Sequence, residues 1–364
     1  MIQAAWRKCT WGAVLAATAA CSGTGDVEGR STAPRALSLV PIATLDDGSA
    51  PVLGEPSWVA GHPDGRFLVP DFSDRNVKIY DAAGKRAGTL GRAGQGPGEF
   101  SGPMYTGFYH DSIVEVDFVN GISLFSPQGR FARKLSLRGP RNRPVMDARV
   151  VDDSLLLLLT PAGGDRGTRL LSLVRSDGTE VSSFFDAYHL VGRDPEVVQS
   201  MGVQADGRGG VVFAALVGGD SLFAFDYSGA RLAASLVDPA QPLVPVRKLI
   251  AANGGRRRKP DGSWVMHNNR NVLRIVALDS STAVVFVAPY DTLNGTDPIQ
   301  GGTVLVVTLE HGRIRHIGRR EVAAGLIGRD SGGRALMLGY ADSAAERYVL
   351  SHLRFDEATP QPGR

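Results

Sequence analysis

Short apolar runs alternate with turn residues through most of the chain, and the pattern is clearest over residues 58–100. That stretch contains four apolar runs, each of which ends in glycine, proline or aspartate. Short runs that end in such turn residues are typical of β-strands joined by hairpins. The stretch therefore predicts one four-stranded antiparallel sheet, and variants of the same unit recur to the C-terminus.

A regular mark closes the third strand of successive units. A strand residue, usually aromatic or aliphatic, is followed four positions later by glycine in the pairs Tyr80/Gly84, Phe125/Gly129, Val174/Gly178, Phe225/Gly229 and Thr308/Gly312. Glycine suits a turn at this point because it adopts positive φ without strain. The spacings between these glycines are 45, 49, 51 and 83 residues. The first three match the length of a propeller blade, about 40–50 residues.

Six such units can be counted. They are centred near residues 58–91, 106–138, 147–185, 199–237, 271–318 and 324–355. The last unit stops after its third strand, whereas residues 37–45 form a strand that has no unit of its own. We therefore predict an all-β fold, a six-bladed β-propeller of four-stranded antiparallel blades in which the N-terminal strand completes the last blade. Closing the ring in this way removes free sheet edges, which promote aggregation.

The 83-residue spacing leaves two interpretations of residues 238–269. A degenerate blade could be hidden there, or one loop between blades could be expanded; the scarcity of apolar alternation favours the loop. Long loops in compact domains often carry function, although charged runs in loops are commonly just solvated. A solvated basic run is the favoured interpretation here, and the functional alternative is a binding loop for an anionic partner, formed by Arg256, Arg257, Arg258, Lys259, Trp264, His267 and Arg270. If the propeller has a binding face, this loop is where we expect it.

The N-terminus has the features of an export signal. Arg7 and Lys8 precede an apolar, alanine-rich segment that is too short to span a bilayer and that ends in small residues before Cys21. This pattern resembles a bacterial lipoprotein signal, and an ordinary secretory signal is the alternative. We predict a signal peptide at 1–20, lipid attachment at Cys21, a flexible tether at 21–36, the propeller at 37–358 and a tail at 359–364.

Charge and cysteine content narrow the function classes. Removal of residues 1–20 would lower the formal net charge from +3 to +1, because Arg7 and Lys8 leave with a segment that has no acidic residue. A nearly neutral chain gives no reason to expect nucleic-acid binding. Cys21 would be the only cysteine left, so no internal disulfide could stabilise the exported protein.

The strings Val69-Pro70-Asp71, 75–84 and Gly-Arg-x-Gly-x-Gly-Pro-Gly-Glu-Phe at 91–100 resemble the bacterial six-bladed β-propeller family related to NHL repeats. The resemblance is strong over about 50–130, and later units share only the periodicity. It implies a secreted or lipid-anchored propeller, in a family most of whose members have no assigned activity.

Candidate chemistry is sparse. The glycines of 91–98 lack the Lys-Ser/Thr pair and the helix that a phosphate loop requires, so they are interpreted as a crossover between blades in which Phe100 packs. Glu55 faintly resembles the first metal ligand of gluconolactonase-like propellers, but the further Asn and Asp ligands were not found, and a loop residue is the favoured interpretation. His189, His267 and Tyr290 could serve a lyase of the peptide-amidating type.

The favoured function is a non-catalytic binding or scaffold propeller on the cell envelope. It would recognise a protein, glycan or small ligand by loops on one face and by the axial channel. We expect a monomer held at the membrane, in the outer membrane or facing the periplasm, by its lipid anchor alone. No cofactor is predicted. The alternative is a propeller lyase or lactone hydrolase with a divalent metal at the axis, which would require convergent carboxylate, amide or histidine ligands at the channel mouth.

Overall fold

The structure is a computed structural model of the 364-residue chain. It describes residues 35–45, 53–137, 145–152, 154–160, 167, 169–186, 202–244, 256–258, 264–266, 270–288, 300–342 and 347–356. The chain divides into two compact units, 1–32 and 33–364, and every described residue lies in the second. The described residues form strands and turns without an α-helix, and so include no helix that could span a membrane.

Three four-stranded antiparallel sheets follow one another along the middle of the chain. In each, strands that are consecutive in sequence are hydrogen-bonded neighbours. Their strands are β8 (Pro103–Tyr109), β9 (Ser112–Asp117), β10 (Gly121–Phe125) and β11 (Phe131–Leu135); β12 (Asp147–Asp152), β13 (Leu155–Leu159), β14 (Arg169–Val174) and β15 (Glu180–Asp186); and β16 (Val203–Arg208), β17 (Val211–Leu216), β18 (Ser221–Asp226) and β19 (Arg231–Leu236).

The remaining large sheet has 12 strands, in the order β22-β23-β24-β25-β1-β28-β27-β26-β2-β3-β4-β5. Their bounds are β22 (Asn271–Ala277), β23 (Thr282–Ala288), β24 (Gln300–Glu310), β25 (Arg313–Ala324), β1 (Arg35–Leu45), β28 (Arg347–Phe355), β27 (Ala335–Asp342), β26 (Leu326–Arg329), β2 (Ala60–Gly61), β3 (Phe67–Asp71), β4 (Asn76–Tyr80) and β5 (Arg86–Leu90). Only short parallel contacts join β25 to β1 and β26 to β2.

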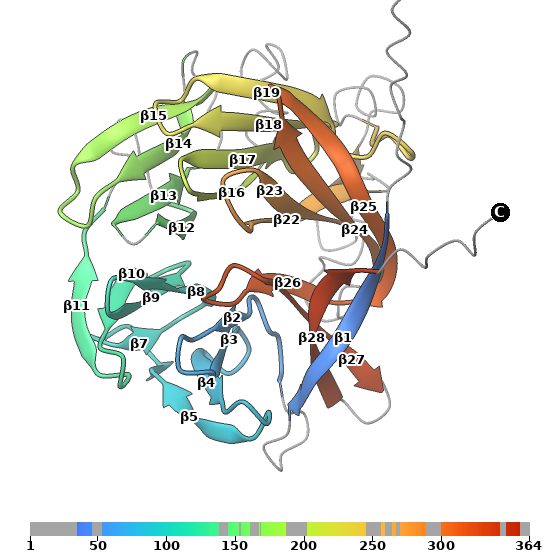
Figure 1. Ribbon diagram of the computed structural model, residues 1–364. Helices are drawn as coiled ribbons and strands as arrows, with labels where there is room; N and C mark the ends of the chain where they lie inside the picture. Colours follow the sequence, from blue (N-terminus) through green and yellow to red (C-terminus); the bar gives the residue numbers. More distant parts are fainter. Residues whose placement is uncertain are drawn as a thin grey trace, which may run out of the picture. The chain divides into compact units, whose positions relative to one another are not determined.

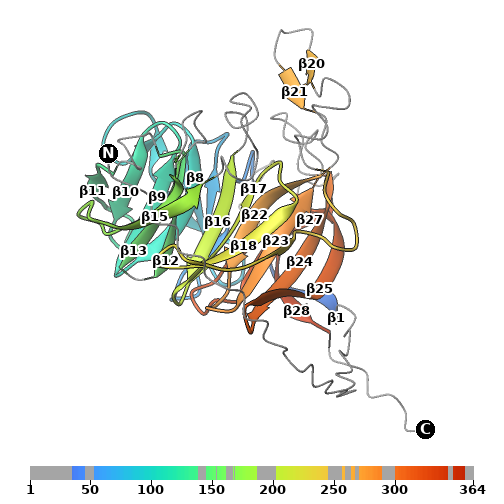
Figure 2. The same cartoon turned by 90° about the horizontal axis from the view of Figure 1, so that it is seen from above.

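The sheets are arranged around a common centre, as in a β-propeller (Figures 1 and 2). The strands β2, β8, β12, β16, β22 and β26 are innermost, and successive strands lie farther out. Hydrogen bonds do not join the sheets into one continuous barrel. The sheets are held together by apolar side chains, since several buried clusters combine residues from neighbouring sheets.

The N-terminal strand β1 pairs with the last strand of the chain, as the sequence predicts. It runs antiparallel to β28 from Leu37 opposite Phe355 to Leu45 opposite Tyr348, with an irregularity at Pro41. Leu37 and Leu45 are buried, whereas Val40 is exposed, so one side of the strand contributes to the core. β1 therefore acts as the fourth strand beside β26, β27 and β28.

The five glycines that mark the ends of third strands all adopt positive φ. The angles are 85° at Gly84, 80° at Gly129, 88° at Gly178, 88° at Gly229 and 72° at Gly312. These values are in the left-handed region, which favours glycine. The predicted turn positions are therefore confirmed.

The glycine-rich segment after β5, residues 91–100, packs against side chains of its own residues. Its two short strands, β6 (Arg92–Ala93) and β7 (Glu99–Phe100), pair in parallel. Phe100 is fully buried between the first sheet and the next, with its ring centroid 5.7 Å from that of Phe125. The Glu99 carboxylate accepts hydrogen bonds from the Gly96 amide and the Arg92 guanidinium. A Cβ atom at Gly94 would lie 2.1 Å from that carboxylate, so the loop encloses its own acidic group. The crossover interpretation fits this geometry.

The long segment between β19 and β22 contains one small antiparallel sheet. Its strands are β20 (Arg256–Arg258) and β21 (Trp264–Met266), with Arg257 opposite Val265. Its described residues form no four-stranded sheet. Most of residues 238–269 lie outside the described residues, so the expanded loop stays a prediction.

Candidate functional site

Three arginines from different innermost strands gather at the centre of the sheets: Arg149 on β12, Arg274 on β22 and Arg329 on β26. The other buried residues of these strands are largely apolar. Their packing in the core places the three guanidinium groups in the interior. Buried charged groups need counterions or hydrogen-bond partners, because burial removes their hydration.

Arg149 is satisfied by a carboxylate and by two aromatic rings. Its side chain is fully buried and both Nη atoms donate to Asp147. The guanidinium carbon lies 5.1 Å from the ring centroid of Trp58 and 4.7 Å from that of Tyr105. The two rings are 5.0 Å apart. This arrangement combines a bidentate ion pair with cation–π contacts, and it fixes the position of Trp58.

Arg329 connects four innermost strands. Its Nη1 atom donates to Asp206 on β16 at 3.1 Å and to the Ala277 carbonyl on β22 at 2.8 Å. Its Nη2 atom donates to the Val150 carbonyl on β12. The Asp206 carboxylate is buried and also accepts the amide of Ala277 at 3.0 Å. Arg329 and Asp206 therefore form a structural crosslink near the axis.

Arg274 differs from the other two because it has no carboxylate partner. Its Nη2 atom donates to the Ser57 carbonyl at 2.8 Å, and its guanidinium carbon lies 5.2 Å from the Trp58 ring centroid. No described acidic residue forms an ion pair with it. Burial, and then the positive charge of Arg149, lower the pKa of Arg274 to about 10. It stays protonated at neutral pH, and the residue is half-buried.

A buried carboxyl group without partners lies in the sheet that contains β8 and β9. Glu115 on β9 is fully buried, and neither carboxylate oxygen has a hydrogen-bond partner in the described part of the chain. Thr106, opposite it on β8, has a buried hydroxyl that also lacks one. Burial, and then the charges of Asp117 and Asp147, raise the pKa of Glu115 well above its ordinary value. The group is therefore protonated over a pH range in which an exposed glutamate is ionised.

We expect Glu115→Gln to reduce the pH dependence of folding. Folded Glu115 keeps its proton above the pH at which the unfolded chain releases it, so the unfolding free energy of the wild type falls as pH rises through this range, by up to about 1.4 kcal/mol per pH unit. Glutamine has no such proton. Urea unfolding at about pH 5 and about pH 8 measures the slope. Glu180→Gln, at an exposed position, should keep the wild-type slope; equal slopes in all three proteins would contradict the assignment.

The residues of the predicted binding loop are only partly described. Arg256, Arg257 and Arg258 form β20 and Trp264 begins β21, and only their backbones are described. Cys21, Lys259, His267, His189 and Tyr290 lie outside the described residues, as do the proposed signal peptide and C-terminal tail. The role of this loop stays a prediction.

Arg270 is the one loop residue whose side chain is described. It forms an ion pair with the buried Asp238 at 2.9 Å and donates to the Thr303 hydroxyl at 2.6 Å. The same Asp238 binds Arg319. Arg270 thus attaches the end of the loop to the sheet, four residues before Arg274. Glu55 is an exposed loop residue, as favoured from the sequence, and its amide donates to Asp71.

The axial residues were not among those selected from the sequence. Trp58, Tyr105, Arg149, Arg274 and Arg329 are far apart along the chain. The usable signal is an arginine within an apolar strand, as in the run that contains Arg274 (Val-Leu-Arg-Ile-Val). The described residues contain no group of three or more His, Cys, Asp or Glu side chains arranged to hold a metal ion.

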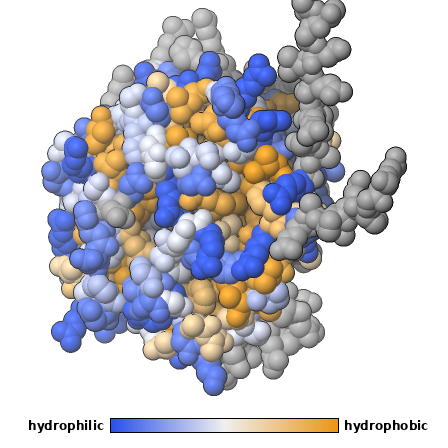
Figure 3. All heavy atoms as spheres, viewed as in Figure 1, coloured by the Kyte–Doolittle hydropathy of each residue, from blue (hydrophilic) through white to orange (hydrophobic). Residues whose placement is uncertain are grey.

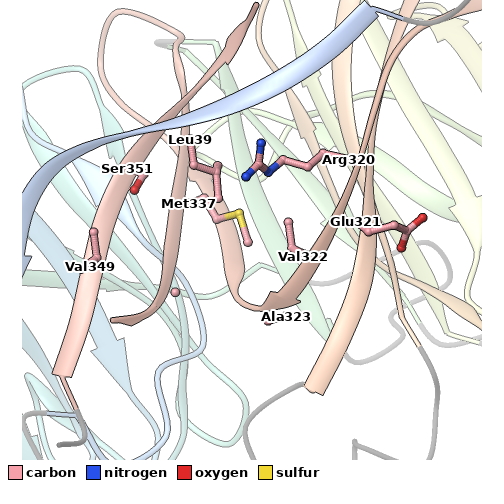
Figure 4. Close-up of a pocket in the computed structure, with 9 residues that line it drawn as sticks. Leu39, Arg320, Glu321, Val322, Ala323, Met337, Val349 and Ser351 are labelled. Carbon is pink, nitrogen blue, oxygen red and sulfur yellow. The ribbon is translucent and has the colours of Figure 1, made fainter. Parts of the chain in front are cut away.

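A cavity of about 360 Å³ lies between β25 and the pair β27 and β28, where β1 crosses (Figure 4). Leu39, Val322 and Met337 give it a mainly apolar lining. Arg320 lies at its edge and donates from Nη1 to the Leu37 carbonyl. This contact ties β1 to β25, so Arg320 has a role in holding the N-terminal strand.

The surface in Figure 3 mixes hydrophilic and hydrophobic residues. Among the exposed apolar residues, Phe118 and Val119 form the turn between β9 and β10, and Phe72 follows β3. The Phe72 amide donates to Glu55 and the Phe118 amide to Gly102, so these turns lie at the end of the sheets where the innermost strands begin. That end also carries Ser57.

Solved structures share this fold. A member of the DUF4221 family from Bacteroides vulgatus has a TM-score of 0.55 and 12% identity, over 90% of this chain and 100% of its own. An exported protein from Bacteroides fragilis has a TM-score of 0.52 and 11% identity, over 88% and 96%. The Cps50 (Swd1) β-propeller domain from Myceliophteria thermophila has a TM-score of 0.41 and 11% identity, over 86% and 99%. No protein-family model and no curated protein matches the chain.

The radial arrangement of four-stranded sheets defines a β-propeller protein, and the two Bacteroides structures, with TM-scores above 0.5, are similar to it in fold. They establish its fold, and the function must be inferred from its own residues.

Proposed function

We propose that this protein is an exported, six-bladed propeller that acts as a binding module. Three blades are the separate four-stranded sheets, and the 12-stranded sheet supplies three more, β22 to β25, β2 to β5, and β26 to β28 with β1. The β1–β28 pairing supports ring closure by the N-terminal strand. NHL-type ancestry, export through residues 1–20 and lipidation of Cys21 are further parts of the proposal. The exported protein among the structural neighbours supports export alone.

One observation carries the binding role: Arg274, a half-buried arginine without a carboxylate partner, lies against the buried Trp58 among the innermost strands. Arg149 and Arg274 both lie over the Trp58 ring, and the Asp147 carboxylate is already bound by Arg149. Rigid aromatic and arginine side chains are the groups that dominate recognition surfaces. The alternative, a metal-dependent lyase or lactone hydrolase, requires free convergent oxygen or nitrogen ligands. The described axial carboxylates Asp147 and Asp206 are instead each bound to an arginine.

Metal analysis of the purified mature protein separates these two functions. We expect no stoichiometric divalent metal, and no rise in melting temperature with calcium, magnesium, manganese or zinc beyond that given by equal ionic strength of sodium chloride. A tightly bound metal in a one-to-one ratio would replace the binding role by the metal-dependent enzyme. Fractionation of cells that express the wild type or Cys21→Ser tests the location, because loss of the lipid should release the protein from membranes.

A further inference from the structure

We propose that Arg274, held against Trp58, is an anion-binding group that receives the carboxylate or phosphate group of the ligand. This inference rests on the proposed binding function and specifies the chemistry of its axial site. A site for a hard metal ion is lined by oxygen ligands, and a purely apolar pocket is lined by hydrocarbon side chains. Neither kind of site would contain a guanidinium without a carboxylate partner.

The charges at the axis leave one arginine without a counterion. Arg149 is neutralised by Asp147, and Arg329 by Asp206. Glu115 is near enough to Asp147 for their charges to interact, but its burial favours the neutral acid. Arg274 is the remaining charge, and an anion is its missing partner. An arginine that only stabilised the fold would be expected to have a carboxylate partner, as the other two do.

The geometry leaves Arg274 ready to bind. A guanidinium has five N–H donors, and this one has a single hydrogen bond, from Nη2 to the Ser57 carbonyl. That bond and the contact with Trp58 restrict the orientation of its plane. No other described residue accepts a hydrogen bond from its remaining donors, and the residue is half-buried whereas Arg149 is fully buried. Carboxylate and phosphate oxygens match the paired donors of arginine, and a fixed guanidinium loses little entropy on binding them.

The position of Arg274 also connects it to the predicted binding loop. The loop ends at Arg270, whose ion pair with Asp238 fixes the start of β22. Arg274 therefore lies on the strand that directly follows this loop. The binding step is association only, with no bond made or broken.

Calorimetric titration of the full-length mature chain tests the proposal. The probes are inorganic phosphate and malonate, each against sodium chloride of equal ionic strength, so that phosphate and carboxylate recognition are distinguished. We expect saturable binding of at least one of them at one site per chain, with a matching rise in melting temperature. If neither probe binds beyond the chloride control, the proposal is overturned.

Two substitutions locate the site. Arg274→Met should weaken the binding of the active probe about ten-fold or more, because a charge-assisted hydrogen bond is lost. Arg133→Met removes an equal charge from an exposed position on β11 and should leave binding unchanged. Arg274→Lys keeps the charge without the paired donors and should bind with intermediate affinity, which keeps the test valid if the methionine variant fails to fold. Wild-type affinity in both Arg274 variants would overturn the proposal.

The outcome is separable from that of the metal analysis. Absence of anion binding in a metal-free protein would reject Arg274 as an anion site and leave the propeller as a binding module of other specificity. A stoichiometric metal would reject the binding module itself.

Discussion

Replacement of Leu45 by aspartate is expected to abolish most of the folded population. Leu45 is fully buried on β1 in a cluster with Val59, Tyr80 and Leu350, so it packs the N-terminal strand against residues of β4 and β28. Truncation of a buried leucine alone costs about 2–5 kcal/mol, and a buried unpaired carboxylate adds to that. The total is comparable with the whole stability of a typical domain, about 5–15 kcal/mol.

Urea unfolding followed by circular dichroism measures this effect. The matched control is Val40→Asp, on the exposed side of the same strand, opposite His352. It should change the unfolding free energy by about 0.5 kcal/mol or less. If the two variants are equally stable, Leu45 is not buried against β4 and β28, and the N-terminal strand lies elsewhere.

The second large effect is expected from Asp147→Asn. The substitution leaves the fully buried guanidinium of Arg149 without its counterion while the shape of the side chain is nearly unchanged. Breaking one partner of a buried ion pair typically costs about 3–5 kcal/mol, because the other charge stays buried and unpaired. We therefore expect a large decrease in the urea midpoint.

A double variant shows how much of the lost unfolding free energy comes from the missing Asp147–Arg149 ion pair and how much from the unpaired charge of Arg149. Asp147→Asn with Arg149→Met should recover much of the stability, since no uncompensated charge remains. Asp111→Asn, in an exposed turn, serves as the control with about 0.5 kcal/mol or less of change. A single Asp147 variant as stable as this control would contradict the buried ion pair.

The fold was predictable because its signals are local and repeated. The turn glycines follow from the φ angle that a tight turn needs, so Gly84 and its four counterparts could be placed by spacing alone. The pairing of β1 with β28 was predictable by a count: one unit lacked a strand and one strand lacked a unit. Phe100 was likewise recognisable as a packing residue, because the glycine string before it had no phosphate-binding context.

The axial site was not predictable in the same way. Trp58, Arg149 and Arg274 are each separated by more than one repeat along the chain, and sequence spacing does not show which inner-strand residues meet in a ring. In the sequence, the run of consecutive arginines at 256–258 instead indicates the candidate binding site. Isolated arginines in apolar strands were the more informative signal, because a charge enters a core only where a partner or a ligand compensates it.

The axis as a binding site is tested most directly by a crystal structure of the mature protein soaked in sodium selenate, whose selenium can be located by anomalous scattering. We predict a selenate ion with oxygen atoms about 3 Å from the guanidinium nitrogens of Arg274, beside the Trp58 ring. Selenate bound only at exposed arginines such as Arg133, with water alone beside Arg274, would contradict this account.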